Sequence, residues 1–475
     1  MNVRFATFLA AIAVAVGSAD AAARVHPSVH RALRQDGTVD LIVRLAQTTE
    51  STLESIQEAA FSSRTAKVEA VKSKLQEQSK VASAEVESLL SKEASGLHGG
   101  YKNFWISNQV SIKGASFELV TKLAGLASVA EIREEEIIFE AKPIADAKGQ
   151  TNELVGQEWG IKRIGANKIW ADGNIGQGVI VGSIDSGVRG THEALSRNFL
   201  GSHGWFDAEN QTALSYDISG HGTHTMGTIA GSHGVGVAPG ATWLTCKGSR
   251  IYQTAEGPKV GFSQADLNVC AQFILCPTKP DGSDADCSKA PRVVNNSWGG
   301  AGGRNFFDGV IDAWIKAGIV PVFSQGNSGP ECSTAGSPGD NTRVIGVGAT
   351  GETDNLAWFS SKGPSLFGRR KPDISAPGFY IRSSYFGSDN DYQVLSGTSM
   401  AAPHVAGSIA LLLATQPDLA IDEVKVALYT TTDQKGLQPS NYTCGGTSDA
   451  AWPNNQWGHG RLNILNAYEG FRPAP

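Results

Sequence analysis

The chain has 475 residues, of which 41% are hydrophobic and 18% charged, and its net charge is −6. This composition is typical of a globular protein with room for two or three domains, and it excludes a disordered or fibrous chain. No block of basic residues stands out, so we expect no nucleic-acid partner.

The first residues predict a secretory signal peptide over residues 1–21. Arg4 precedes an uncharged, largely apolar run from Phe5 to Val16, and small residues suited to cleavage follow. The run is shorter than the roughly 20 residues that a membrane span needs. We therefore expect a secreted, extracellular protein with no membrane partner.

The next elements have mixed character. Residues 40–45 predict a strand. Residues 51–92 are rich in helix-forming residues, with Val68, Val71 and Leu75 at helical spacing. They predict either one long helix or a helical hairpin.

Further strands and a linker complete this region. Apolar residues alternate with polar ones over residues 104–112, which predicts a strand. Residues 117–124 predict a short helix, and residues 129–139 another strand. Residues 141–156 contain proline and glycine but few apolar residues, which indicates a linker. Residues 22–150 are therefore expected to form a small α+β domain with its linker.

The region 151–475 predicts an α/β domain. Its apolar strands are expected at residues 179–184, 292–295, 318–323 and 343–347, with helical segments between them. Continuous apolar strands are typical of parallel sheets covered on both faces, and right-handed crossovers would build three layers. In such sheets, functional side chains gather beyond the carboxyl ends of the strands.

The cysteines are confined to the same region. Their even number and the exported context predict disulfides, and their spacing fits no zinc motif. Cys276 and Cys287 flank a polar stretch with proline, glycine and aspartate, and we predict that they pair. Cys246 lies in an apolar, strand-like segment and is expected to be a buried free thiol.

Two motifs supply an acid and a base. Asp185 ends the first apolar strand, where a buried carboxylate needs a partner, although a turn or helix cap is an alternative. His221 lies between two glycines before an apolar helical run that starts at Met226. A loop or weak metal site is the alternative there. We interpret His221 as a general base and His224 as a packing residue.

Two further motifs supply a nucleophile and a polar donor. Ser399 follows a glycine turn and precedes an apolar helix, whose free N–H groups favour negative charge. Helix capping is the alternative function of Ser399. Asn327 follows the strand at residues 318–323 and could present its amide to an oxyanion, or form an Asx turn.

Together these motifs resemble those of the subtilases. The matching blocks are Ile184-Asp-Ser-Gly187, His221-Gly-Thr-His224, Asn296-Ser-Trp-Gly-Gly300, Gly326-Asn327 and Gly397-Thr-Ser-Met-Ala-Ala-Pro-His404. The order Asp, His, Ser is that of subtilisin, whereas α/β-hydrolases have Ser, Asp, His and a G-x-S-x-G motif that this chain lacks. Further blocks, such as Trp457-Gly-His-Gly-Arg-Leu-Asn463, resemble bacillopeptidase F-like members.

The resemblance implies a fold and a reaction. The fold would be a three-layer subtilisin-like domain with a mainly parallel sheet, preceded by a small α+β inhibitory prodomain. Ser399 would attack the scissile carbonyl, His221 would move the proton, Asp185 would orient His221, and Asn327 would hold the oxyanion. The predicted substrate-binding residues are Ser297, Trp298, Gly299, Ser324 and Gly326.

The resemblance also implies partners. A secreted serine endopeptidase of broad specificity would act on polypeptides, as a monomer made as a self-processing precursor. Its prodomain would serve as inhibitor and folding chaperone. No cofactor is expected, because the segment from Gly231 to Pro239 lacks the loop that binds calcium tightly in many subtilisins; a weak calcium site elsewhere stays open.

Two other functions remain as alternatives. One is a non-catalytic binding protein, although all four catalytic positions are intact. The other is a specialised processing protease. Such enzymes usually carry acidic pocket residues, and none stands near Trp298 or Ser324.

Overall fold

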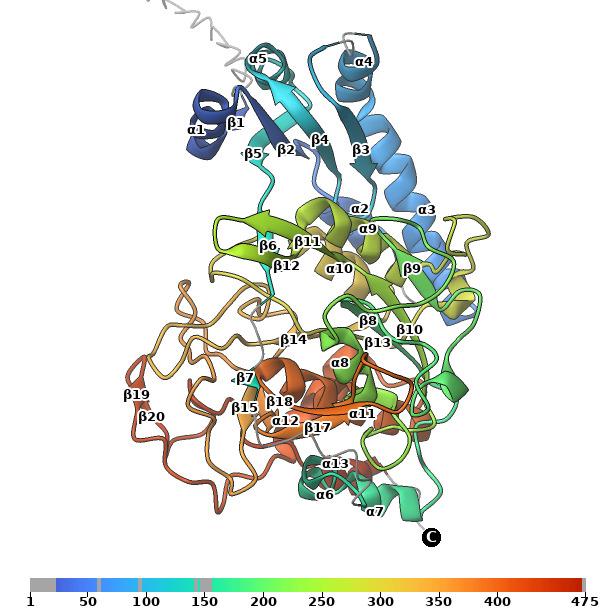
Figure 1. The fold of residues 1–475 in the computed structure, drawn as a ribbon, viewed down its shortest axis with the longest axis vertical. Helices are drawn as coiled ribbons and strands as arrows, with labels where there is room; N and C mark the ends of the chain where they lie inside the picture. The colour runs from blue at the N-terminus through green and yellow to red at the C-terminus, as the bar shows by residue number, and fades with distance from the viewer. Residues whose placement is uncertain (1–22, 58–60, 93–95, 141–143, 146–155, 472–475) are drawn as a thin grey trace, which may run out of the picture.

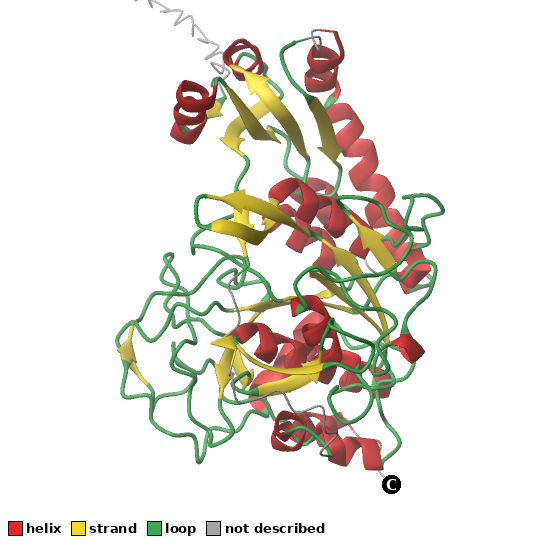
Figure 2. Ribbon diagram, in the orientation of Figure 1, coloured by secondary structure: helices red, strands yellow, loops and turns green. Residues whose placement is uncertain are grey.

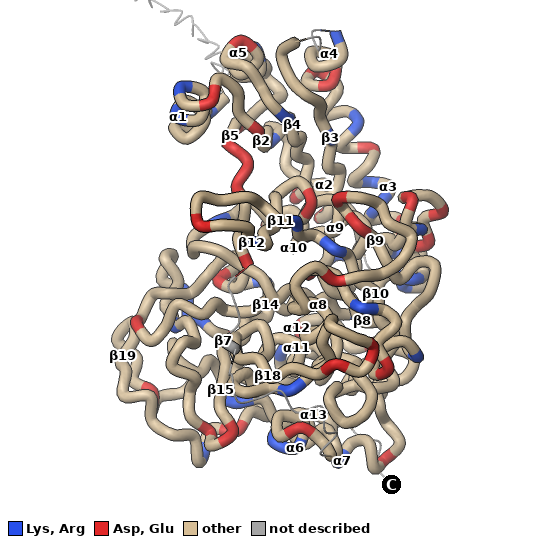
Figure 3. The backbone as a smooth tube through the Cα atoms, viewed as in Figure 1, with Lys and Arg blue, Asp and Glu red and all other residues tan. Residues whose placement is uncertain are grey.

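A computed structural model describes residues 23–57, 61–92, 96–140, 144–145 and 156–471. The predicted signal peptide lies outside the described residues. So does the predicted linker, apart from residues 144–145 and 156. Figure 1 shows a small N-terminal unit at the top of a larger domain, and Figure 3 shows charges of both signs scattered over both.

The N-terminal unit is built on a five-stranded sheet. The strand order is β1-β5-β2-β4-β3, and β2 pairs antiparallel with both β4 and β5. The strands are β1 (Arg24–Val25), β2 (Thr38–Leu45), β3 (Gly100–Phe104), β4 (Gln109–Ser116) and β5 (Val129–Glu134). Helices α1 (Pro27–Asp36) and α5 (Phe117–Ala124) contribute apolar residues to its core.

The predicted strand over residues 104–112 is wrong, because the chain turns there. β3 and β4 form an antiparallel hairpin, and Asn108 in the turn has φ 51°. The left-handed backbone conformation of Asn108 reverses the chain direction. The alternation of apolar and polar residues continues through this turn, so the sequence alone resembles one strand. The predicted strand over residues 129–139 also divides, into β5 and β6 (Ile137–Phe139), which join different sheets.

The helical region divides into three helices, rather than one helix or a hairpin. They are α2 (Glu50–Glu54), α3 (Arg64–Ala82) and α4 (Ala84–Lys92). The Ser63 hydroxyl accepts from the Ala66 N–H and so caps α3. Figure 1 shows α3 leaving the N-terminal sheet and running down the flank of the larger domain.

The larger domain has a seven-stranded sheet in which all strand pairs are parallel. The order is β16-β15-β14-β13-β8-β10-β9. The strands are β8 (Ile180–Asp185), β9 (Trp205–Asp207), β10 (Thr242–Lys247), β13 (Val293–Asn296), β14 (Val320–Ser324), β15 (Ile345–Thr350) and β16 (Ile374–Pro377). Nearly all their residues are buried, as predicted for a sheet covered on both faces.

Helices form a layer on each face of this sheet (Figure 2). One apolar core contains α8 (His221–Ala230) and α11 (Thr398–Thr415), and the other contains α9 (Gln264–Leu275) and α10 (Asp308–Lys316). The three-layer α/β prediction is therefore confirmed. Within the described part of the chain, only α11 is long and apolar enough to cross a membrane, and 89% of it is buried in the core.

Smaller elements surround the sheet. The helices are α6 (Trp159–Ile164), α7 (Ala166–Ala171), α12 (Ile421–Thr430) and α13 (Ile464–Phe471). The strands are β11 (Ser249–Thr254), β12 (Gly257–Ser263), β17 (Ile381–Ser384), β18 (Tyr392–Ser396), β19 (Thr443–Cys444) and β20 (Thr447–Ser448).

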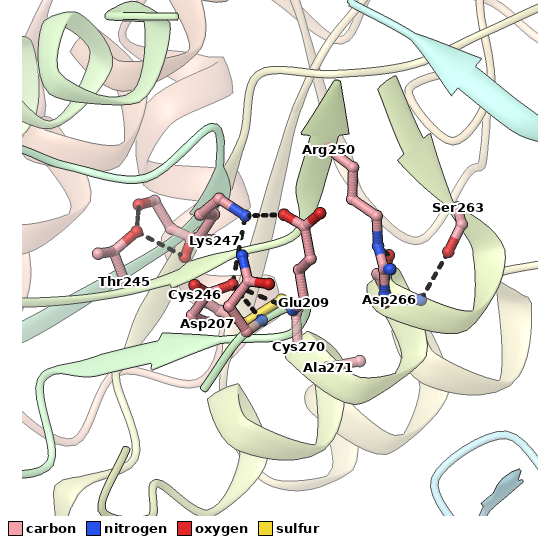
Figure 4. Close-up of a disulfide and its surroundings, with 12 residues drawn as sticks. Asp207, Glu209, Thr245, Cys246, Lys247, Arg250, Ser263, Asp266, Cys270 and Ala271 are labelled. Carbon is pink, nitrogen blue, oxygen red and sulfur yellow. Dashed lines mark hydrogen bonds and ion pairs between the residues drawn. A yellow bond between two sulfur atoms is a disulfide. The ribbon is translucent and has the colours of Figure 1, made fainter. Parts of the chain in front are cut away.

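All six cysteines are paired. Cys276 bonds to Cys287 as predicted, and Cys332 bonds to Cys444. The prediction of a free thiol at Cys246 is wrong, because Cys246 on β10 bonds to Cys270 on α9. The helix packs on the strand and brings the two Cα atoms to 5.5 Å, which no local pattern indicates. Beside this disulfide, the buried Lys247 ammonium pairs with Asp207 and Glu209 (Figure 4).

Candidate active site

The predicted site residues lie at the carboxyl edge of the parallel sheet. Asp185 is the last residue of β8, and Asn327 follows the end of β14. His221 is the first residue of α8, so this helix begins earlier than the predicted start at Met226. Ser399 lies in the first turn of α11, which packs beside α8.

A short hydrogen bond joins the acid and the base. His221 Nδ1 donates to Asp185 Oδ1 over 2.7 Å, since a carboxylate oxygen at the end of β8 accepts. The second carboxylate oxygen accepts from Thr225 Oγ1 at 3.2 Å. With the proton on Nδ1, the lone pair of His221 Nε2 is available. Nε2 is buried and has no hydrogen-bond partner in the described part of the chain.

The electrostatic surroundings favour the imidazolium form of His221. Burial lowers the pKa of His221, but the Asp185 and Glu140 carboxylates outweigh it and raise that pKa to about 9. The neighbouring histidine behaves in the opposite way. Burial and the charge of His221 lower the pKa of His224 to about 3. His224 Nε2 instead donates to the carbonyls of Ile381 and Gln393, which ties α8 to β17 and β18.

Asp217 positions His221, and the sequence interpretation missed it. Its carboxylate accepts from the backbone N–H groups of Ser219, Gly220 and Thr223 at 2.8–3.0 Å. These bonds cap the start of α8 and hold the turn that carries His221. The sequence did contain a pattern that could have identified Asp217, because an aspartate a few residues before a helix is a common cap.

Ser399 is held by an unusual helix start. Pro403 lies inside α11, and a proline cannot donate to the carbonyl four residues earlier. That carbonyl belongs to Ser399, and Ser297 Oγ donates to it instead at 2.8 Å. The Ser399 hydroxyl donates to the Ser297 carbonyl at 3.1 Å. Ser297, the residue after β13, therefore holds both the carbonyl and the hydroxyl of Ser399.

The side chain of Asn327 has a defined orientation. Its Oδ1 accepts from the Thr398 backbone N–H and from Thr398 Oγ1, both at 2.9 Å. Because a backbone N–H can only donate, the oxygen must face Thr398. The Nδ2 donor is left beside Gly397, where a Cβ atom would lie 3.4 Å from it. Among the residues that the structure describes, this donor has no hydrogen-bond partner, and Asn327 lines the same pocket as Ser399.

A pocket of about 310 Å³ opens at the same edge. Its lining includes Asn327, Ser399 and the five predicted substrate-binding residues, Ser297, Trp298, Gly299, Ser324 and Gly326. No charged side chain lines it among the described residues. Such a pocket does not select for a charged side chain.

The chain itself adds strands beside this site. β6 pairs antiparallel with β12, and β7 (Ile144–Ala145) pairs antiparallel with β18. The Ile138 side chain lies in the apolar cluster of Trp298, and Glu140 accepts from Ser219 Oγ at 3.1 Å. The sequence pattern gave no reason to place Glu140 next to His221.

Comparisons with known proteins identify the family. The model of the subtilase family matches residues 176–456, more than half of the chain.

This chain belongs to the subtilase family.

One relative is bacillopeptidase F of Bacillus subtilis strain 168, which is 33% identical over an alignment that covers 77% of this chain and 26% of that protein. Another is serine protease AprX of the same strain, which is 34% identical over 57% of this chain and 65% of that protein. Subtilisin DY of Bacillus licheniformis is 35% identical over 58% of this chain and 92% of that protein. The chain thus spans about a quarter of bacillopeptidase F and just under two thirds of AprX.

Proposed function

We propose that the protein is a secreted serine endopeptidase of the subtilisin type, made as a self-processing precursor. The observation that carries the proposal is the Asp185–His221 hydrogen bond beside the helix start that holds Ser399. His221 Nε2 is buried and has no hydrogen-bond partner among the described residues, and once the imidazolium has lost its Nε2 proton this atom is the base that such a reaction needs.

The proposed reaction follows from these atoms. Ser399 Oγ forms a bond to the scissile carbonyl carbon, and its proton passes to His221 Nε2. Asp185 holds the ring orientation and stabilises the imidazolium. The oxyanion accepts from Asn327 Nδ2 and the Ser399 backbone N–H. The oxyanion then re-forms the carbonyl as the scissile C–N bond breaks, and the imidazolium gives its proton to the leaving amine. In the second half, water loses a proton to His221 and attacks the acyl carbon, the ester bond to Ser399 Oγ breaks, and His221 returns the proton to Ser399 Oγ.

The proposed substrate is an extended polypeptide with few constraints on its side chains. Support comes from β6, a segment of the chain that already lies as an added strand on β12, which is the mode of binding by β-augmentation. The uncharged pocket at Ser324 and Gly326 favours broad specificity over a processing protease that selects for basic residues.

We also propose that residues 22–150 contain an inhibitory prodomain that assists folding, and that the enzyme cuts itself between residues 141 and 157. β6 lies just before this window and β7 lies within it, and the two strands pair with β12 and β18 of the peptidase domain. Assistance with folding is expected because a parallel sheet joins strands that are distant in sequence. The mature peptidase is proposed to act as an extracellular monomer without a cofactor.

The test of the chemistry is Ser399→Ala. The variant is expected to lose peptidase activity, to resist labelling by a fluorophosphonate probe, and to accumulate as an uncut precursor. The wild-type chain is the matched control. Labelling or turnover of the purified variant at the wild-type rate would contradict the proposal and favour a non-catalytic binding protein.

A further inference from the structure

Helix α3 belongs by its contacts to the peptidase domain. Its buried residues Val68, Val71 and Leu75 are fully covered, and they lie in the same apolar cluster as Cys276 and Cys287. This cluster also contains residues of α9 and α10, together with Leu53, Ile56 and Ile106 of the N-terminal unit. The apolar face of α3 is therefore covered partly by its own unit and partly by the peptidase domain.

The core of the N-terminal unit hardly uses this helix. That core includes Val86 and Leu90 of α4, and from α3 only Ala82, in the last turn, packs against it. A helix needs a partner for its apolar face. For most of α3 that partner is the surface formed by the Cys276–Cys287 loop and the neighbouring helices.

Polar contacts fix the first turn of α3 to the same surface. Arg64 donates to the carbonyls of Ala290 and Pro291, at 3.0 and 2.6 Å. Further along, the Lys72 ammonium lies 3.7 Å from Cys276 Sγ. The two carbonyls stand just before β13, so Arg64 joins α3 directly to the central sheet.

This contact is separate from the strands beside the active site. β6 and β7 pair with β12 and β18, whereas α3 packs against the 3-10 turn at Cys287–Lys289. Figure 1 shows α3 extending along the flank of the peptidase domain, away from β7 and β18. Loss of one contact therefore leaves the other intact.

We propose that α3 is a second anchor of the N-terminal unit, and that the surface around the Cys276–Cys287 loop and residues 290–291 is its docking site. The proposal rests on the proposed self-cleavage, because an anchor matters once the two parts are separate chains. Linked contacts raise the effective concentration of one another. Besides α3 and the strands β6 and β7, the side chains of Ser107 and Gln109 donate to Asn268 Oδ1 and to the Phe306 carbonyl. The N-terminal unit then stays bound through α3 after its C-terminal end has left the active site.

The experiment measures how fast the N-terminal unit dissociates, in a chain that cannot cut itself. A recognition sequence for an unrelated site-specific endopeptidase is placed within residues 146–155 of the full-length Ser399→Ala chain, and the added endopeptidase makes the cut. The dissociation rate of the N-terminal fragment from the nicked complex is then measured. A Val71→Ala, Leu75→Ala chain is compared with Glu77→Ala, whose side chain is exposed on the same helix.

The double variant is expected to dissociate at least tenfold faster, which corresponds to about 1.4 kcal/mol. The Glu77→Ala control should stay within about twofold of the parent chain, because exposed substitutions have small effects. Arg64→Ala removes the carbonyl contacts without opening a cavity, and it should also accelerate dissociation. Equal rates for all four chains would overturn the proposal.

The design separates this proposal from the proposed function. Failure of the wild-type chain to cut itself would contradict self-processing and would not change the rates of the nicked Ser399→Ala complex. Circular dichroism of each uncut chain checks that the N-terminal unit is folded. Should the double variant be unfolded, the dissociation rate of the Arg64→Ala chain is compared with that of the parent chain, and equal rates overturn the proposal.

Discussion

The side chain of Glu140 should make binding of the N-terminal unit depend on pH. Burial next to the Asp185 and Asp217 carboxylates raises the pKa of Glu140 to about 7, although His221 lowers it. The groups that face it are His221 on α8, Asp185 on β8, Asp217 before α8, and Tyr385 after β17. Burial and the charges of Asp217, Glu140 and Asp391 raise the pKa of Tyr385. We therefore expect Glu140 to bind as a neutral acid below about pH 7 and as a carboxylate above it.

The raised pKa of Glu140 decides in which direction the binding affinity changes with pH. The free carboxyl has an ordinary pKa of 4.5. Its contribution to binding is complete below that value and is lost as the pH rises to about 7. The difference corresponds to at most about 3 kcal/mol, and partial exposure of Glu140 reduces it. Between pH 5 and pH 8, the affinity should fall by about tenfold to a hundredfold.

The assay titrates free active sites. The wild-type chain is allowed to cut itself, and a fluorophosphonate probe then reports the unblocked fraction from pH 5 to pH 8. Glu140→Gln should flatten the profile, because an amide keeps the hydrogen bond to Ser219 and does not titrate. Glu136→Gln is the control, since Glu136 pairs with Arg304 at the surface. A Glu140→Gln profile as steep as that of the wild type would refute the reasoning.

Three further predictions concern the mature enzyme. Trp298→Leu should change the preferred residue several positions before the cut more than at the cut, because strand alternation turns Trp298 away from the position of the cut; peptide-library profiles that match the wild type would count against this. Asn327→Leu should lower kcat about 10²–10³-fold, a value carried over from a subtilisin, and kinetics with kcat unchanged would exclude the oxyanion role. Cys276→Ser with Cys287→Ser should reduce the free energy of unfolding by about 2–3 kcal/mol, and denaturant titration checks it.

The sequence by itself predicted the α/β domain, which the structure confirms, and it supplied the residues on which the proposed chemistry depends. The apolar runs ending near Asp185 and before Asn327 are local patterns, and buried parallel strands follow from them because only such strands lack polar alternation. The residue types and their order were also enough to predict that Asp185 and His221 meet. Each of these inferences depends on residues within a few positions of one another.

The tertiary structure decided the contacts between distant segments. The Cys246–Cys270 bond, the position of Glu140 beside His221, and the partner of α3 all join residues whose own neighbours predict nothing about the pairing. The apolar face of α3 looks the same whether it packs on its own unit or on another domain. Its partner was decided by which surface could cover it in three dimensions. The hydrophobic effect is non-directional, so the sequence of an apolar face does not specify the surface that buries it.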